Sequence, residues 1–121
     1  MSSWQQSETL PLVISETLEG EQLLLELEIS ADLFQFRGHF DSMPVLPGVA
    51  QLDWAVLFTR EKLGVKLDIN EVAQLKFRSL IRPGMRLTLT LVHQSEKNRV
   101  SFEYRRDETI FSSGFLKLAP Q

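Results

Sequence analysis

A histidine and an aspartate, 14 positions apart, have the types and the spacing that acid–base chemistry needs. His39 and Asp53 lie in residues 37–53, which read R-G-H-F-D-S-M-P-V-L-P-G-V-A-Q-L-D. An imidazole can take up a proton near neutral pH. A carboxyl group held among apolar residues resists ionisation, so it can donate a proton. Together the two side chains could remove a proton from one atom of a substrate and deliver one to another.

The surroundings of Asp53 also admit a purely structural interpretation. Residues 49–58 read V-A-Q-L-D-W-A-V-L-F, and only Gln51 and Asp53 among them are polar. This pattern predicts a helix buried on nearly all sides. A buried carboxylate has to be neutralised, paired or hydrogen-bonded. A bond from Asp53 to a backbone group or a nearby cation would satisfy that need, so the residues alone leave both interpretations open.

The helix that carries Asp53 has clear limits in the sequence. Pro47 suits the first helical position, where its missing N–H costs nothing, and Gly64 suits the end. The free N–H groups at such a helix start, together with the positive end of the helix dipole, can stabilise a negative charge that develops on a substrate.

Length and composition exclude several classes of protein. The 121 residues predict one domain, covering 9–121, after a flexible arm at 1–8. A net charge of −3 disfavours a nucleic-acid binder held by bulk charge. The absence of cysteine excludes disulfides and thiolate sites. The sequence shows no secretory signal and no apolar run long enough to span a membrane, so we expect a cytoplasmic protein.

Strands are expected on both sides of the helix. Alternating apolar residues predict them at 22–29, 72–79, 85–93 and 99–105, with further strands at 10–14 and 109–118. In the strand at 72–79, Ala73, Leu75 and Phe77 should share one face. Short turns between the later strands predict an antiparallel sheet. We therefore expect an α+β fold in which the sheet curls around the helix, and an open sheet edge that favours a dimer.

Residues 37–53 resemble a known family. The pattern G-H-F-x-x-x-P-V-x-P-G-V, followed by an acid 14 positions after the histidine, is similar to that of the β-hydroxyacyl-ACP dehydratases of FabA/FabZ type. The later phrase F-R-S-L-I-R-P-G-M-R-L also resembles this family, and P-G-V-A-Q-L-D-W-A looks most like its ApeI-like branch. Asp41 stands where many members have proline. The acid is Glu in one subgroup of the family and Asp in the other, and here it is Asp53.

The resemblance implies a hotdog fold and a 3-hydroxyacyl-ACP (or CoA) dehydratase of fatty-acid or aryl-polyene-type lipid synthesis. In that activity His39 is the base and Asp53 the acid. The Gly48 N–H would bind the thioester oxygen, and the backbone carbonyl near Val45 would hold the His39 ring. His39 of one protomer would face Asp53 of another, so a homodimer is implied. No metal or organic cofactor is implied.

The acyl chain and its carrier need surfaces of their own. Four aromatic residues are candidates for lining an acyl tunnel, although each could equally pack in the core: Phe34, Phe36, Phe40 and Trp54. An acidic carrier protein would need a basic patch, and the candidates are Lys76, Arg78, Arg82 and Arg86. A solvated strand face explains those four residues equally well.

Two other functions remain open from the sequence. A hotdog thioesterase would use the helix acid to activate water against the thioester carbonyl. A non-catalytic acyl-binding partner would keep the fold without turnover. The paired G-H-F and P-G-V motifs favour dehydration over a thioesterase, and the presence of both His39 and Asp53 argues against a non-catalytic partner.

Overall fold

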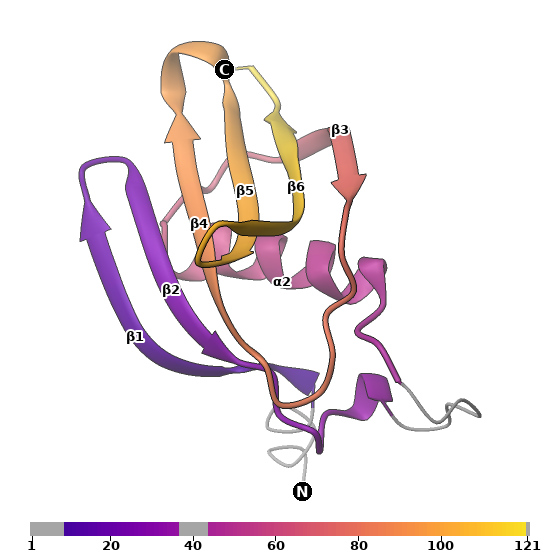
Figure 1. The fold of residues 1–121 in the computed structure, drawn as a ribbon. Coiled ribbons are helices and arrows are strands. Elements are labelled where there is room, and N and C mark those ends of the chain that lie inside the picture. Colours follow the sequence, from indigo (N-terminus) through magenta and orange to yellow (C-terminus); the bar gives the residue numbers. More distant parts are fainter. Residues whose placement is uncertain (1–8, 37–43, 121) are drawn as a thin grey trace, which may run out of the picture.

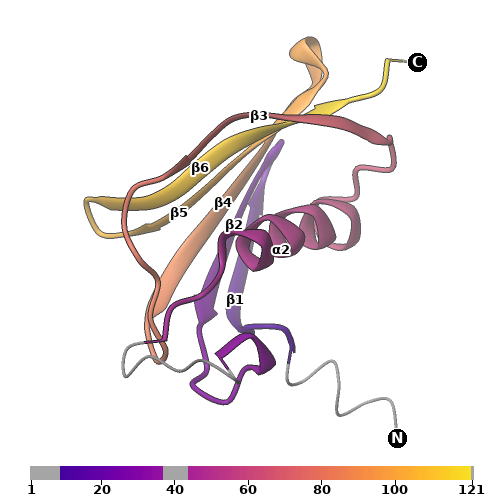
Figure 2. The same cartoon turned by 90° about the vertical axis from the view of Figure 1, so that its right-hand side faces the viewer.

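In the computed structural model, which describes residues 9–36 and 44–120, six antiparallel strands form one sheet that curls around a long helix (Figures 1 and 2). The strands are β1 (Leu12–Glu19), β2 (Gln22–Glu28), β3 (Ile69–Phe77), β4 (Arg86–Gln94), β5 (Arg99–Arg106) and β6 (Thr109–Leu118). The helices are α2 (Gly48–Glu61) and two 3-10 turns, η1 (Phe34–Phe36) and η2 (Ser95–Lys97). The strand order β1-β2-β4-β5-β6-β3 leaves β1 and β3 at the two edges.

The core lies between the sheet and α2, and alternating residues of the central strands build it. Leu23, Leu25 and Leu27 of β2 are all buried, and the buried residues of the next two strands also alternate: Leu87, Leu89 and Leu91 of β4, and Val100, Phe102 and Tyr104 of β5. This confirms the predicted alternation. The turn before β4 is tight: Gly84 has a positive φ of 86° and the Met85 N–H donates to the Arg82 carbonyl at 3.4 Å.

The first strand differs from the prediction. The sequence indicated a strand at 10–14, whereas β1 runs to Glu19 and pairs with β2 over nearly its whole length. The polar residues of its second half hid the strand, because an edge strand is mostly exposed and does not need an apolar face. Lys62, just after α2, pairs with Glu16 of β1 at 2.9 Å, and this joins the helix end to the sheet edge.

Helix α2 lies on the concave side of the sheet (Figure 2) and is buried on one side only, contrary to the prediction. Its buried residues are Ala50, Gln51, Trp54, Ala55, Phe58 and Thr59. Val49 is 66% exposed and Asp53 is also exposed. Apolar residues therefore occur on both sides of α2, but a single copy of the chain covers only one side.

Strand β3 contains a bulge that changes which residues face the helix. Ala73 pairs with Phe115 and Lys76 with Ser113, so one extra residue of β3 is accommodated between them. Gln74 takes up the bulge with a left-handed φ of 51°. The expectation that Ala73, Leu75 and Phe77 share one face is therefore wrong for Ala73: it pairs with Phe115 on the outer face, whereas Phe77 pairs with Ser112 and faces the helix.

No helix in the described part of the chain is both long and apolar enough to cross a lipid bilayer.

Candidate active site

The start of α2 is fixed by backbone hydrogen bonds. Pro47 is the N-cap, one position earlier than predicted, with an extended ψ of 148° and no side-chain cap. Its carbonyl accepts from the N–H groups of Ala50 and Gln51 at 3.1 and 3.3 Å. Just before it, the Leu46 N–H donates to the Ile81 carbonyl at 2.8 Å. Gly48 is thus the first helical residue, and the first N–H groups of a helix have no partner within the helix.

An aromatic ring lies directly against Gly48. A Cβ atom added at Gly48 would stand 2.6 Å from the Phe77 ring, so only glycine fits there without moving that ring. Phe77 is the last residue of β3 and remains 51% exposed. The sequence analysis missed this residue. The alternation placed Phe77 on the apolar face of its strand, but nothing in the sequence indicated a contact with Gly48.

Asp53 lies on the outward side of α2. It follows Val49 by four positions, so both side chains are on the same helical face, and both are exposed. In a single chain Asp53 is therefore exposed, and not held among apolar residues as the sequence pattern had indicated.

A buried tyrosine lies close behind this acid. Tyr104 of β5 is fully buried, and its hydroxyl donates to the Gln51 carbonyl at 2.6 Å. Burial raises the pKa of the Tyr104 phenol well above its usual value, and the negative charge of Asp53 raises it further. The phenol stays neutral and acts as a hydrogen-bond donor to the helix.

Gln51 is the second residue that the sequence analysis did not assign. Its side chain is buried, its Nε2 donates to the Leu46 carbonyl at 3.2 Å, and its Oε1 accepts from the Ser112 hydroxyl at 2.6 Å. The signal was present in the sequence, because a polar side chain inside an apolar run has to find a partner.

The structure places the other predicted residues as follows. His39 and Phe40 lie outside the described residues, and Val45 is half-buried just before the helix. Trp54 is buried, with its indole N–H donating to the Thr9 carbonyl at 2.9 Å, which is a core position in the single chain. In η1, Phe36 is buried and Phe34 is exposed.

The four basic candidates are spread over the molecule. Lys76 is on β3 and Arg86 on β4, and the strand order places β5 and β6 between them. Three strand spacings separate them by roughly 14 Å. Arg86 also pairs with Glu28 at 3.3 Å. Arg78 and Arg82 lie in the segment between the two strands, where Arg78 is exposed and Arg82 half-buried.

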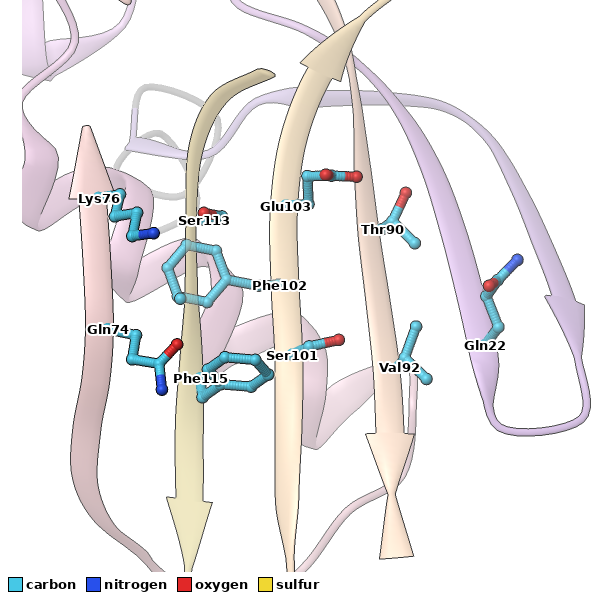
Figure 3. Close-up of a pocket in the computed structure, with 11 residues that line it drawn as sticks. Gln22, Gln74, Lys76, Thr90, Val92, Ser101, Phe102, Glu103, Ser113 and Phe115 are labelled. Carbon is cyan, nitrogen blue, oxygen red and sulfur yellow. The ribbon is translucent and has the colours of Figure 1, made fainter. Parts of the chain in front are cut away.

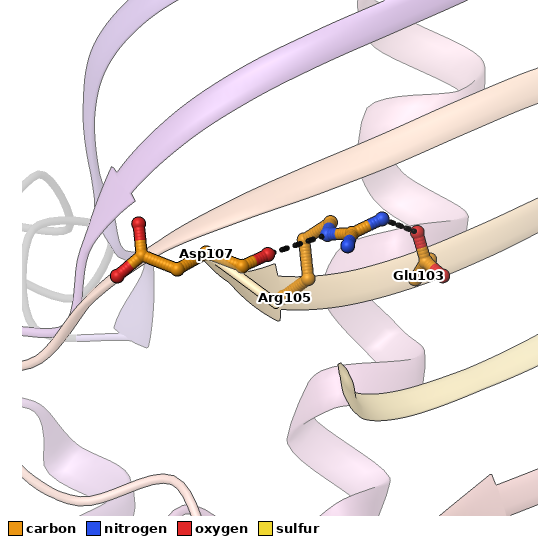
Figure 4. A network of polar contacts seen from close by, with 3 residues as sticks. All are labelled: Glu103, Arg105 and Asp107. Atoms are coloured by element: carbon orange, nitrogen blue, oxygen red, sulfur yellow. Dashed lines mark hydrogen bonds and ion pairs between the residues drawn. The ribbon is translucent and has the colours of Figure 1, made fainter. Parts of the chain in front are cut away.

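The outer face of the sheet, opposite the helix, is polar and largely neutralised. On β5, the Arg105 guanidinium contacts Glu103 at 3.3 Å and donates to the Asp107 carbonyl at 3.2 Å (Figure 4). A cavity of about 430 Å³ lies on the same face, with Gln74 and Lys76 of β3 on one side and Thr90 on the other (Figure 3). Its lining includes neither Asp53 nor Gly48, so this cavity is separate from the helix start.

Among the described residues, no group of three or more His, Cys, Asp or Glu side chains is arranged to hold a metal ion.

Solved structures with this fold include dehydratases. The chain is similar to the dehydratase heterocomplex ApeI:P from Xenorhabdus doucetiae, with a TM-score of 0.84 and 29% identity over 92% of this chain and 99% of that one. It is also similar to an uncharacterised protein from Erwinia carotovora subsp. atroseptica, with a TM-score of 0.79 and 35% identity over 92% and 97%. The dehydratase domain of PpsC from Mycobacterium tuberculosis, at 23% identity and a TM-score of 0.69, shares the fold. The expected hotdog fold is confirmed.

Sequence comparison leads to the same group. A curated relative, the 3-hydroxyacyl-(acyl-carrier-protein) dehydratase FabZ of Oenococcus oeni (strain ATCC BAA-331 / PSU-1), is 30% identical over 94 residues, which are 72% of this chain and 68% of the relative. The family described as ApeI dehydratase matches residues 15–115, which is most of the chain. The chain therefore belongs to the ApeI-like family of dehydratases.

Proposed function

We propose that the protein removes water from a 3-hydroxyacyl thioester and releases the trans-2-enoyl thioester. The observation that carries the proposal is the position of Asp53, which lies on the exposed side of α2. It is on the second turn of the helix, whose first residue, Gly48, has no side chain. In this family such a helix start and acid belong to a dehydratase. The substrate would be carried on acyl carrier protein or CoA, in fatty-acid or aryl-polyene-type lipid synthesis.

The reaction divides among three groups. His39 takes the proton from the carbon next to the thioester carbonyl, since its basicity suits neutral pH. The negative charge that builds on the thioester oxygen is stabilised by the Gly48 N–H at the positive end of the helix. Asp53 gives a proton to the departing hydroxyl, which leaves as water. Proton removal and proton delivery balance, so the reaction needs no oxidant or reductant.

The proposal includes a homodimer. Asp53 is exposed in a single chain, and so are three apolar side chains near it in the fold: Val49 beside Gly48, Phe77 against Gly48, and Leu80 next to Ile81, whose carbonyl holds the Leu46 N–H. β3 also has an open edge beside this surface (Figure 1). A second copy docked here would cover Asp53 and bring in His39 of the partner subunit.

One assay separates the proposed activity from its alternatives. Purified protein is mixed with a 3-hydroxyacyl thioester on CoA and on acyl carrier protein. Formation of the enoyl product, followed by its ultraviolet absorbance, is the expected result. Free thiol without enoyl product would instead identify a thioesterase. Saturable binding without either product would identify an acyl-binding protein.

The shared site has its own test. Two inactive variants, His39→Ala and Asp53→Asn, are mixed under conditions where subunit exchange is demonstrated with labelled chains. Activity should return in the mixture, because a mixed dimer contains one site with both functional residues. Exchange without any return of activity would show that His39 and Asp53 act within the same chain.

A further inference from the structure

Every polar group of Gln51 forms a hydrogen bond, and the partners lie in three separate segments of the chain. Its side-chain Nε2 donates to the Leu46 carbonyl, and its backbone N–H donates to the Pro47 carbonyl. Its Oε1 accepts from Ser112 of β6, and its backbone carbonyl accepts from Tyr104 of β5. Gln51 therefore links two strands of the sheet to the two residues that lead into the helix.

These bonds act together with the bond from the Leu46 N–H to the Ile81 carbonyl, and the combined set fixes the orientation of three consecutive peptide groups. A peptide group is planar and trans, so its C=O and N–H point in opposite directions and turn together. The Leu46 N–H is held by the Ile81 carbonyl, which also fixes the Val45 carbonyl of the same peptide group. The Leu46 carbonyl is held by the Gln51 side chain. The Pro47 carbonyl is held by the Gln51 and Ala50 N–H groups, which also fixes the Gly48 N–H.

Two of the atoms fixed in this way have roles in the proposed reaction. The carbonyl near Val45 would orient the His39 ring, and the Gly48 N–H would bind the thioester oxygen. We propose that Gln51 is a positioning residue of the dehydratase site, which holds both groups in register without touching the substrate. This inference rests on the proposed function.

The anchors of Gln51 are suited to that role. Ser112 and Tyr104 are both fully buried, so water does not compete for these bonds. The Ser112 hydroxyl occupies the Oε1 atom, which leaves the Nε2 atom directed at Leu46. Tyr104 remains a neutral donor because its pKa is raised by burial and by Asp53.

The first part of the test compares turnover per folded molecule, well below the melting temperature. Gln51→Leu should lower kcat on the order of 100-fold with little change in KM, because a small misplacement of reacting groups has effects of this size. Ser112→Ala, which removes one anchor, should lower kcat less. The matched control is Thr59→Val on the same buried side of α2, whose hydroxyl has no partner among the described residues; its kcat should be unchanged. An unchanged kcat in Gln51→Leu would overturn the proposal.

The second part uses pH. Gln51→Glu keeps the length of the side chain, but its carboxylate has no donor for the Leu46 carbonyl, whereas the protonated form has one. The kcat of Gln51→Glu relative to the wild type should therefore rise as pH is lowered. A loss of packing alone would not produce this dependence, so a ratio that stays flat would contradict the positioning role.

The third part does not depend on activity. Amide hydrogen exchange at Leu46 should be faster in Gln51→Leu than in the wild type, while exchange at Ile29, whose N–H donates to the Met85 carbonyl, should not change. Unchanged exchange at Leu46 would show that Gln51 does not hold the loop. A different outcome is also informative: exchange at Leu46 is faster in the variant, but the wild-type protein turns over no 3-hydroxyacyl thioester. That outcome would overturn the proposed function and, with it, the catalytic part of this inference.

Discussion

The two sides of helix α2 differ in what covers them. The side toward the sheet carries Trp54, Phe58 and Gln51, all buried and in contact with the strands. The opposite side carries Val49 and Asp53, both exposed in a single chain. The first side holds the fold together and orients the helix start. The second side presents the acid, and its apolar neighbours are suited to contact with another surface.

Under the proposed function, one helix serves stability on its sheet side and chemistry on its outward side. A change on the sheet side should alter the free energy of unfolding at any protein concentration. A change on the outward side should alter turnover or assembly and leave the folding of one chain nearly intact. The following four predictions test that separation, starting with the largest expected effect.

Removing the acid should abolish turnover without unfolding the protein. Asp53→Asn should lower kcat by about 10²- to 10⁴-fold, the usual contribution of a positioned acid or base. The melting temperature measured at high dilution, where single chains prevail, should change little because Asp53 is exposed in the single chain. Glu61→Gln is the control, since Glu61 is an exposed acid of the same helix. Comparable losses of activity in both variants would contradict a specific role for Asp53.

Truncating the sheet side should destabilise the single chain. Phe58 is 3% exposed, and Phe58→Ala should lower the free energy of unfolding by about 3–5 kcal/mol through the cavity it leaves. Denaturant unfolding at several protein concentrations measures this loss. Val49→Lys should remove only the part of the stability that depends on protein concentration, because assembly adds stability by mass action. A similar loss in both variants at high dilution would show that the two faces are not separate.

The contact between Gly48 and Phe77 should matter more for turnover than for stability. Gly48→Ala places a methyl group against the Phe77 ring, and the ring is exposed enough to move away. We expect a loss of about 1–3 kcal/mol in unfolding free energy and a larger loss of turnover, since the methyl group blocks the Gly48 N–H.

The double variant Gly48→Ala/Phe77→Ala separates these two effects. It should recover stability relative to Gly48→Ala, because the added methyl group then has space. It should not recover turnover. Recovery of both would show that the methyl group itself does not obstruct the substrate.

The smallest effect is expected from Tyr104 at alkaline pH. A raised phenol pKa means that the folded state keeps a proton that the unfolded state loses above pH about 10. The stability from this bond is therefore complete below that pH and falls as pH rises, by up to about 1.4 kcal/mol per pH unit. Tyr104→Phe should lose this part of the pH dependence. Tyr104 is the only tyrosine in the sequence, so the ultraviolet titration of the phenol reports on this residue alone.

Much of the fold was predictable because the central strands bury one face. Leu23, Leu25 and Leu27 alternate with polar residues, and this period of two is typical of a strand with one side in the core. The helix limits followed from Pro47 and Gly64. The wrong face assigned in β3 has a clear cause: the bulge at Gln74 shifts the alternation by one residue, and glutamine gives no turn signal.

The candidate site was only partly predictable. The P-G-V-A-Q-L-D stretch placed Gly48 and Asp53 in the first two turns of one helix. The sequence pattern could not show which side of that helix the sheet covers. Gln51 is two residues from Asp53 and equally polar, yet one is buried and bonded while the other is exposed. That distinction depends on Ser112 and Tyr104, which lie more than 50 positions away in the chain.

The place of β3 in the sheet affects how the chain is made. β3 pairs with β6, so Phe77 lies opposite Ser112, a residue synthesised much later. A nascent chain that has emerged only as far as β5 has α2 and β3 but lacks the strand that binds β3. The ring over Gly48 and the Ser112 bond to Gln51 therefore assemble last, when β6 leaves the ribosome.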